Sequence, residues 1–410
     1  MTVTEIDKKV ERSHERESEL IFACARTQVN LERLRSLAAS LPEPLDWEFI
    51  CRVAGRNGLL PLVGKNLLNT CSDLLDAKFL SVLSEFLRDH IRNNILQTSK
   101  VIEISHLLDS AGIPVLPIKG PTLAIQAYDD ISLRHYVDLD MLVQPRHFDR
   151  SVTVLQKAGY APLDKASWLQ RKGLFFTRKK DLGLVSEDKQ IRIELHWKLS
   201  GTHFAMPVEI GELWDRLETV SVAGKDLRAL AFNDLFVYLC LHGSRHGWQK
   251  LLWICDIHEL IRKTEGIGSG IDWFEVRQHA RAHGCEKALE LGILLIYDLF
   301  GRNTDYPEIE RILADKTYRK IAEHVRSSSF GIAEPSMEIG DWYAYHLSLK
   351  EKMSDRLRMR MVYLGWYLKV AVKPNRLDEA VLSLPSAFYP LYYLIRPVRL
   401  TLSKLAPKHP

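Results

Sequence analysis

The pattern of apolar and polar positions is clearest in one stretch, where it predicts two strands joined through a short helix. An apolar run at 113–118 predicts the first strand, which ends in Lys119 and Gly120. A proline suits the first turn of a helix over 121–127, and the apolar run 139–144 predicts the second strand. This order of strand, turn, helix and strand predicts the centre of the fold.

The pattern continues into further elements of the same core. Helical spacing at 145–158 is followed by three short runs that are typical of strands, at 174–177, 183–186 and 191–197. The polar segment 178–183 predicts the hairpin turn between the first two of these runs.

Helical periodicity dominates both sides of this core. Apolar residues recur at helical spacing from 18 to 110, from 207 to 263 and from 273 to 300. Aromatic-rich helical segments follow at 361–372 and 380–400. The predicted class is therefore α+β, a small mixed sheet flanked by helical regions. The expected divisions are a helical region at 1–110, the core at 111–200, a helical domain at 201–345 and a helical extension at 346–410.

Two carboxylates stand at the head of the second predicted strand. Asp138 and Asp140 should project from the same face, while Leu139 points the other way. Neighbouring carboxylates repel each other unless they share a cation, and Mg²⁺ prefers oxygen ligands. Glu194, in the alternating run 191–197, is the candidate for the third carboxylate of a two-metal site. The alternatives are a polar edge strand or loop cap for the pair and a solvated strand face for Glu194.

Composition narrows the class of protein. The 410 residues are 46% hydrophobic and 26% charged, which is typical of a soluble globular protein. A net charge of +4 gives no case for nucleic-acid binding, and six scattered cysteines without a CxxC pair favour reduced thiols. The charged N-terminal segment lacks the apolar core of a secretory signal, and no uncharged apolar run reaches the ~18 residues that span a bilayer. We expect a cytoplasmic protein without an integral membrane segment.

Several of these residues together form a recognisable set, which comprises Lys119-Gly120, Arg134, Asp138 to Val143, Ala158 to Tyr160 and Glu194 to Trp197. With them the chain resembles the uncharacterised nucleotidyltransferase family of the DNA polymerase β-like nucleotidyltransferase superfamily. The resemblance is strong over about residues 110–200 and weaker over 241–260. Two features differ from the wider superfamily. Lys119-Gly120 replaces the usual Gly-Ser pair, and the interval from Gly120 to Asp138 is longer.

The resemblance implies transfer of a nucleoside monophosphate from an NTP, ATP foremost, to an acceptor, with release of pyrophosphate. Asp138, Asp140 and Glu194 would be the catalytic residues and would hold two Mg²⁺ ions, which Mn²⁺ could replace. The acceptor would be a small molecule, a peptide or a protein, and no nucleic-acid partner is expected. A non-catalytic nucleotide-binding scaffold that serves a biosynthetic partner is the alternative hypothesis. A kinase-like enzyme is disfavoured because neither a Walker A loop nor the glycine-rich kinase signature occurs.

Four further residues are candidates for nucleotide binding. Lys119 offers a positive charge for phosphate, and Gly120 lets the backbone approach it, although both could form a plain exposed turn. Arg134 is expected to contact the triphosphate, with a structural ion pair as its alternative. His196 shares the strand face of Glu194, where it could line the site, hold that carboxylate in place or lie on the surface.

A second polar cluster lies in the helical domain. His242 and His246 are four residues apart, so a continuous helix would place them on one face, at a spacing that can bind a metal. A zinc-protease motif is excluded because the glutamate beside the first histidine is absent. The favoured hypothesis is that Arg245, with one or both histidines, faces the nucleotide or the acceptor. Structural packing around Trp253 is the alternative.

The C-terminal segment 388–400 combines apolar, aromatic and basic residues. An interfacial membrane contact is one interpretation of this composition. Because its prolines interrupt a long amphipathic helix, docking on the protein's own helices or on a partner is the preferred interpretation.

Overall fold

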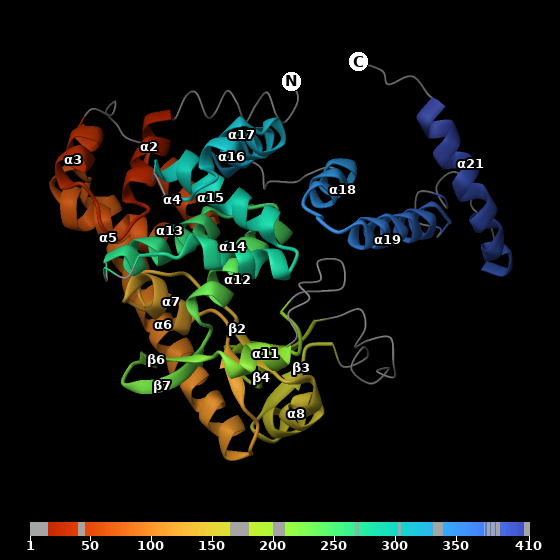
Figure 1. The fold of residues 1–410 in the computed structure, drawn as a ribbon, viewed down its shortest axis with the longest axis horizontal. Helices are drawn as coiled ribbons and strands as arrows, with labels where there is room; N and C mark the ends of the chain where they lie inside the picture. The colour runs from red at the N-terminus through yellow and green to blue at the C-terminus, as the bar shows by residue number, and fades with distance from the viewer. Residues whose placement is uncertain are drawn as a thin grey trace. The chain divides into compact units, whose positions relative to one another are not determined.

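The structure is a computed structural model, in which the chain divides into two compact units (Figure 1). The first comprises residues 1–342 and the second residues 343–410, and each is described by itself. The structure describes residues 15–39, 46–164, 180–199, 210–266, 268, 270–301, 305–330, 339–372, 374, 378, 382 and 386–405.

Helices form the described chain before the sheet, as the apolar spacing predicts. Two of them begin at an aspartate, because the side chains of Asp46 and Asp76 accept hydrogen bonds from the backbone N–H groups of Phe49 and Phe79. The elements are α2 (Glu15–Cys24), α3 (Leu31–Ala39), α4 (Trp47–Arg56), α5 (Leu60–Cys71), η1 (Ser72–Leu74) and α6 (Ala77–Ser110).

A mixed sheet of five strands follows α6. The strands are β1 (Val115–Pro117), β2 (Leu139–Val143), β3 (Tyr160–Pro162), β4 (Asp181–Ser186) and β5 (Arg192–His196). Their order is β1-β2-β5-β4-β3, with β2 and β5 parallel and the other neighbours antiparallel. The helix α7 (Pro121–Tyr128) links β1 to β2, and η2 (Pro145–His147) and α8 (Phe148–Lys157) follow β2. A small mixed sheet with helices on both sides of it in the sequence confirms the predicted α+β class.

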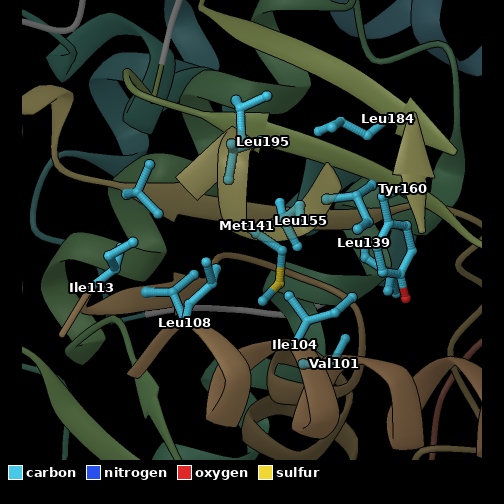
Figure 2. Close-up of a cluster of buried hydrophobic side chains, with 14 of the residues drawn as sticks. Val101, Ile104, Leu108, Ile113, Leu139, Met141, Leu155, Tyr160, Leu184 and Leu195 are labelled. Carbon is cyan, nitrogen blue, oxygen red and sulfur yellow. The ribbon is translucent and has the colours of Figure 1, made fainter. Parts of the chain in front are cut away.

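One face of this sheet packs against α6 and α8. Figure 2 shows Val101, Ile104 and Leu108 of α6 facing Leu139 and Met141 of β2, in a cluster of buried side chains. The same cluster contains Ile193 and Leu195 of β5 and Phe148, Val152 and Leu155 of α8. Because side chains alternate along a strand, the even-numbered residues of β2 and β5 project from the opposite face. Of the predicted carboxylates, Asp140 and Glu194 are therefore on that second face.

A second, two-stranded sheet lies where the periodicity predicts helix. The strands β6 (Glu218–Val222) and β7 (Lys225–Ala229) form an antiparallel hairpin that follows α11 (Ile210–Asp215). The hairpin contacts β1 through β7 and α7 through β6. The predicted turn at 178–183 is also wrong in its second half, because residues 181–183 belong to β4. The predicted strand at 174–177 lies outside the described residues.

Helices form the described part of the first unit after β7. At its centre α12 packs against α13, α14 and α15. None of the six cysteines forms a disulfide. The helices are α12 (Phe232–Arg245), α13 (Leu251–Gly266), α14 (Trp273–Ala282), α15 (Glu286–Phe300), α16 (Ile309–Ala314) and α17 (Lys316–Phe330).

A glycine in α12 is required by close packing. A Cβ atom at Gly243 would lie 2.3 Å from Cζ3 of Trp248, whose side chain is fully buried. We expect Gly243→Ala to lower the free energy of unfolding by about 3 kcal/mol, because the rigid indole has no space to move. Urea denaturation measures the change. Gly55→Ala in α4 is the control, since a Cβ there meets nothing closer than 4.0 Å, and a loss as large as that of Gly243→Ala would contradict the packing argument.

The second unit is built from helices in its described part. It contains α19 (Met353–Val372), η4 (Ser386–Leu391) and α21 (Tyr392–Leu405), and α18 (Ile339–Ser348) spans its start. The helices α19 and α21 contact each other. Within the described part of the chain, no helix is both long enough and apolar enough to cross a membrane.

Candidate functional site

The register of two parallel strands brings two of the three predicted acidic residues together, Asp140 and Glu194, whereas Asp138 precedes β2. Asp140 of β2 lies directly beside Glu194 of β5, and His196 follows on the same face of β5. Ligand atoms of Asp140, Glu194 and His196 all lie within 4.8 Å of one another. This is the one group of three or more such side chains among the residues that the structure describes.

Asp140 is the most strongly bound of the carboxylates. Its two oxygens contact Nζ of Lys119 at 3.1 Å and Nε2 of His196 at 3.0 Å. Burial by itself raises the pKa of Asp140, but the charge of Lys119 and the hydrogen bond from His196 outweigh burial and hold the pKa well below its usual range. Asp140 is therefore a carboxylate at neutral pH.

Asp138 differs from Asp140 because no cationic side chain pairs with it in the described part of the chain. Within the described ranges it has neither a hydrogen-bond nor an ion-pair partner, although it is half-buried. Burial raises the pKa of Asp138, and the neighbouring charges of Glu194 and Asp140 raise it further. A hard cation with oxygen ligands would relieve this repulsion, so the donor set fits a divalent metal.

His196 holds both acidic neighbours from one side. Its Nδ1 lies 3.4 Å from Nζ of Lys180, and an ammonium group can only donate, so Nδ1 accepts and Nε2 carries the proton. Nε2–H then donates to Asp140 at 3.0 Å and also lies 3.5 Å from Glu194. The interaction of Glu194 with His196 is the main reason why the pKa of Glu194 is lowered. Of the three roles considered for His196, this contact supports the one in which it holds the Glu194 carboxylate in place.

Sequence reasoning missed Lys180 and Asp181. The two side chains form an ion pair, and Asp181 of β4 lies opposite His196 of β5. Lys180 also approaches Glu194 at 3.9 Å. Because 178–183 was predicted to be a turn, these residues were not considered part of the site. The alternation of Leu182 and Leu184 was a signal for a strand there.

Lys119 and Gly120 join β1 to α7 at the edge of the carboxylates. Gly120 has a positive φ of 66°, and a Cβ there would meet only Tyr136, at 3.9 Å. The backbone conformation, not a lack of space, therefore requires glycine. The backbone N–H of Ile118 donates to the carbonyl oxygen of Asp140, which fixes this turn beside the carboxylate. The charge of Asp140 is also a main reason why the pKa of Lys119 is raised, despite burial that by itself would lower it.

Arg134 is engaged elsewhere. Its Nε and Nη2 donate to the two carboxylate oxygens of Asp256 in α13, at 2.8 and 2.9 Å. Tyr128 adds a hydrogen bond of 2.9 Å to the same carboxylate. Both charged side chains are buried, so the geometry favours the structural ion pair that was the alternative for Arg134.

Polar residues of α6 hold the segment that leads to Asp138. Asn94 donates hydrogen bonds to the carbonyl oxygens of Ile131 and Arg134, and His90 lies 3.0 Å from that of Ser132. These contacts satisfy backbone groups in a segment without regular structure. They position the chain where it enters β2.

The cluster of His242, Arg245 and His246 at the end of α12 interacts electrostatically with the carboxylate site. Burial lowers the pKa of His242, and the charge of Lys119 lowers it further. Arg245 donates to Nε2 of His246 at 2.8 Å, and burial together with Arg245 lowers the pKa of His246 to about 3. Both imidazoles are therefore neutral at pH 7, and Arg245 carries the positive charge of the cluster.

The same histidines pack against a half-exposed tryptophan. The ring centroids of His242 and His246 each lie 5.2 Å from that of Trp253. The predicted packing around Trp253 is therefore present together with the electrostatic link to Lys119. The two interpretations of this cluster are compatible.

Comparison with known proteins identifies a family, and the solved structures that match include a weak likeness. The model of a family described as uncharacterised nucleotidyltransferase matches residues 43–301. No curated protein matches significantly. The solution structure of the antibiotic-resistance factor ANT(2'')-Ia is similar with 9% sequence identity and a TM-score of 0.32, covering 46% of this chain and 91% of that one. A score this low supports no argument about fold or function.

Proposed function

The chain belongs to the uncharacterised nucleotidyltransferase family, and from this premise we propose that it transfers a nucleoside monophosphate from an NTP, ATP foremost, to an acceptor and releases pyrophosphate. The observation that carries the proposal is that Asp140 and Glu194 lie side by side on parallel strands, near Asp138, which has no ion-pair partner among the described residues. The proposed reaction would take place in the cytoplasm, where NTPs are available. The proposed acceptor group is a hydroxyl, an amine or a phosphate.

The residues would divide the work between metal binding and charge neutralisation. Asp138, Asp140 and Glu194 would hold Mg²⁺, as two ions for which Mn²⁺ could substitute, and the metal would neutralise triphosphate oxygens and favour loss of the acceptor proton. Glu194 has a second proposed role as the base that accepts this proton, since its lowered pKa keeps it ionised at neutral pH. His196 would keep Asp140 and Glu194 oriented through its Nε2–H.

The cations around the carboxylates would bind the phosphates. Nζ of Lys119 lies 3.1 Å from Asp140, at the edge of the carboxylate group where triphosphate oxygens would be bound. Gly120 would let the backbone approach the same phosphates. Arg245 would add a planar donor group from the helical side. Positioning and charge stabilisation would then account for most of the catalysis, as in phosphoryl transfer generally. Arg134 is left out of this set because its Nε and Nη2 bind the buried carboxylate of Asp256.

Calorimetry with the four NTPs, each with and without Mg²⁺, tests the proposal. We expect Mg²⁺-dependent binding of one NTP, and about a tenfold or greater loss of affinity in Arg245→Ala, because a hydrogen bond to a charged group is removed. Arg228→Ala is the matched control, since Arg228 pairs with Asp109 at the surface. Wild type that binds no NTP would contradict the proposal and favour a non-catalytic scaffold. Full affinity in Arg245→Ala would remove Arg245 from the site.

A further inference from the structure

The charge of the chain is distributed unevenly between its two units. Residues 343–410 contain 12 Lys and Arg but only 4 Asp and Glu, a net charge of +8. The whole chain carries +4, so residues 1–342 carry a net charge of −4. The second unit is therefore a strongly basic module on an otherwise slightly acidic protein, and an anionic partner is the natural complement.

An exposed apolar stripe runs along α19 of this module. Met353, Leu357, Met361 and Leu364 recur at helical spacing and are 72%, 61%, 60% and 48% exposed. The opposite side of the helix is packed, because Met359 is buried and Tyr363 stacks on Tyr343 at 4.1 Å. The stripe is therefore the outer face of α19, on the side away from the packed Met359 and Tyr363.

Arginines border this stripe on both sides. Each residue turns a helix by about 100°, so Arg358 and Arg360 emerge on opposite edges of the apolar positions. Both are exposed. Long basic side chains at such borders can extend their charged ends toward anionic groups while their aliphatic parts cover apolar surface.

The segment of η4 and α21 also has a packed inner side and an apolar outer side. Its inner side is anchored, because Arg396 and Arg399 bind the fully buried carboxylate of Asp378 at 2.9 and 2.6 Å. The hydroxyl of Tyr392 also donates to the carbonyl oxygen of Leu382. The outward side chains are apolar or aromatic, and they are Phe388, Tyr389, Leu391, Tyr393, Leu394 and Val398.

We propose that the second unit binds the surface of an anionic lipid bilayer. The outer faces of α19 and of η4 with α21 would enter the interface, while Arg358 and Arg360 contact lipid phosphates. A narrow apolar stripe on a convex helix, bordered by arginines, fits a lipid interface better than the concave pockets that anchor protein partners. Nucleic acid is disfavoured because the exposed residues between the arginines are aliphatic. The protein would lie on the bilayer without spanning it.

Flotation of the full chain with lipid vesicles tests this binding. Vesicles of phosphatidylcholine alone are compared with vesicles of equal parts phosphatidylcholine and phosphatidylglycerol. We expect the protein to float only with the anionic vesicles, and to be released as salt rises, because salt screens the attraction. Arg358→Glu with Arg360→Glu should abolish flotation, whereas the control Lys78→Glu with Lys157→Glu, at exposed positions of the first unit, should retain it.

The apolar stripes are tested separately. Leu357→Glu with Leu394→Glu should reduce vesicle binding by about tenfold or more. The variant loses the free energy gained when the two leucine side chains transfer from water into the lipid interface. Phe274→Glu is the matched control, since Phe274 is an exposed apolar residue of α14 in the first unit. Circular dichroism establishes that each variant is folded.

Three results would overturn the proposal. The first is wild type that floats with neither kind of vesicle. The second is flotation of Arg358→Glu with Arg360→Glu at the wild-type level. The third is wild type that is dimeric by light scattering, stays off vesicles and becomes monomeric in Leu357→Glu with Leu394→Glu, because a second copy would then cover the stripes.

Discussion

Replacing Asp138 and Asp140 by asparagine is expected to lower turnover by about a thousandfold or more and to abolish Mg²⁺-dependent nucleotide binding. Asparagine keeps the shape of each side chain but removes the charge on which metal binding and phosphate neutralisation depend. A loss of this size is typical when a group that stabilises transition-state charge is removed from a phosphoryl-transfer enzyme. Calorimetry measures the binding, and pyrophosphate release with the bound NTP measures the turnover.

The two single variants should differ in stability. Because the folded protein raises the pKa of Asp138, ionised Asp138 opposes folding at neutral pH, and Asp138→Asn should raise the melting temperature while it removes activity. Ionised Asp140 contributes to stability in the opposite direction, because its pKa is lowered in the folded state and its charge favours folding. Asp140→Asn should therefore lower the melting temperature. Asp226→Asn, at an exposed position of β7, is the control. Retained turnover in the double variant would refute the assignment of both residues.

Breaking the buried ion pair between Arg134 and Asp256 should have the largest effect on stability. We expect Asp256→Ala to lower the free energy of unfolding by about 3–5 kcal/mol, because the Arg134 guanidinium is left buried without its counterion. The hydroxyl of Tyr128 also loses its acceptor. Urea denaturation measures the loss. The exposed pair of Asp109 and Arg228 is the control, and Asp109→Ala should cost less than about 1 kcal/mol.

A double variant separates the structural role of Arg134 from a role in nucleotide binding. Arg134→Met with Asp256→Leu removes both charges and should recover part of the stability that Asp256→Ala loses, since apolar residues can replace a buried ion pair. If Arg134 is structural, this variant binds NTP with wild-type affinity. Recovered stability with lost NTP affinity would restore the original expectation that Arg134 contacts the triphosphate.

The hairpin of β6 and β7 shows how a local signal was overlooked. Ala223 and Gly224 both have positive φ angles, of 50° and 73°, as the two central residues of a tight hairpin turn often do. Alanine rarely adopts this conformation, so Ala-Gly signals a turn more weakly than Asn-Gly. Each strand does alternate, with Val220 and Val222 in β6 and Leu227 and Ala229 in β7 on the more buried side, but the alternation covers only five residues of each strand.

The sequence alone determined which side chains share a face. Leu139 and Met141 alternate with Asp138 and Asp140, and this period of two places the carboxylates opposite the core in any sheet that buries the apolar residues. The helical regions on either side were equally accessible, because apolar spacing of 3.6 residues is a local property. The α+β class followed from these two periods.

Only the tertiary structure decided which of these faces meet. The pairing of Asp140 with Glu194, the contact of Lys180 with His196 and the burial of Arg134 against Asp256 join residues far apart in the chain. Periodicity specifies the side of an element from which a residue projects, but not the neighbouring element or its register. In the sequence, Arg134 could therefore not be distinguished from an arginine that binds phosphate. The structure favours the other interpretation, because Asp256 of α13 is its counterion.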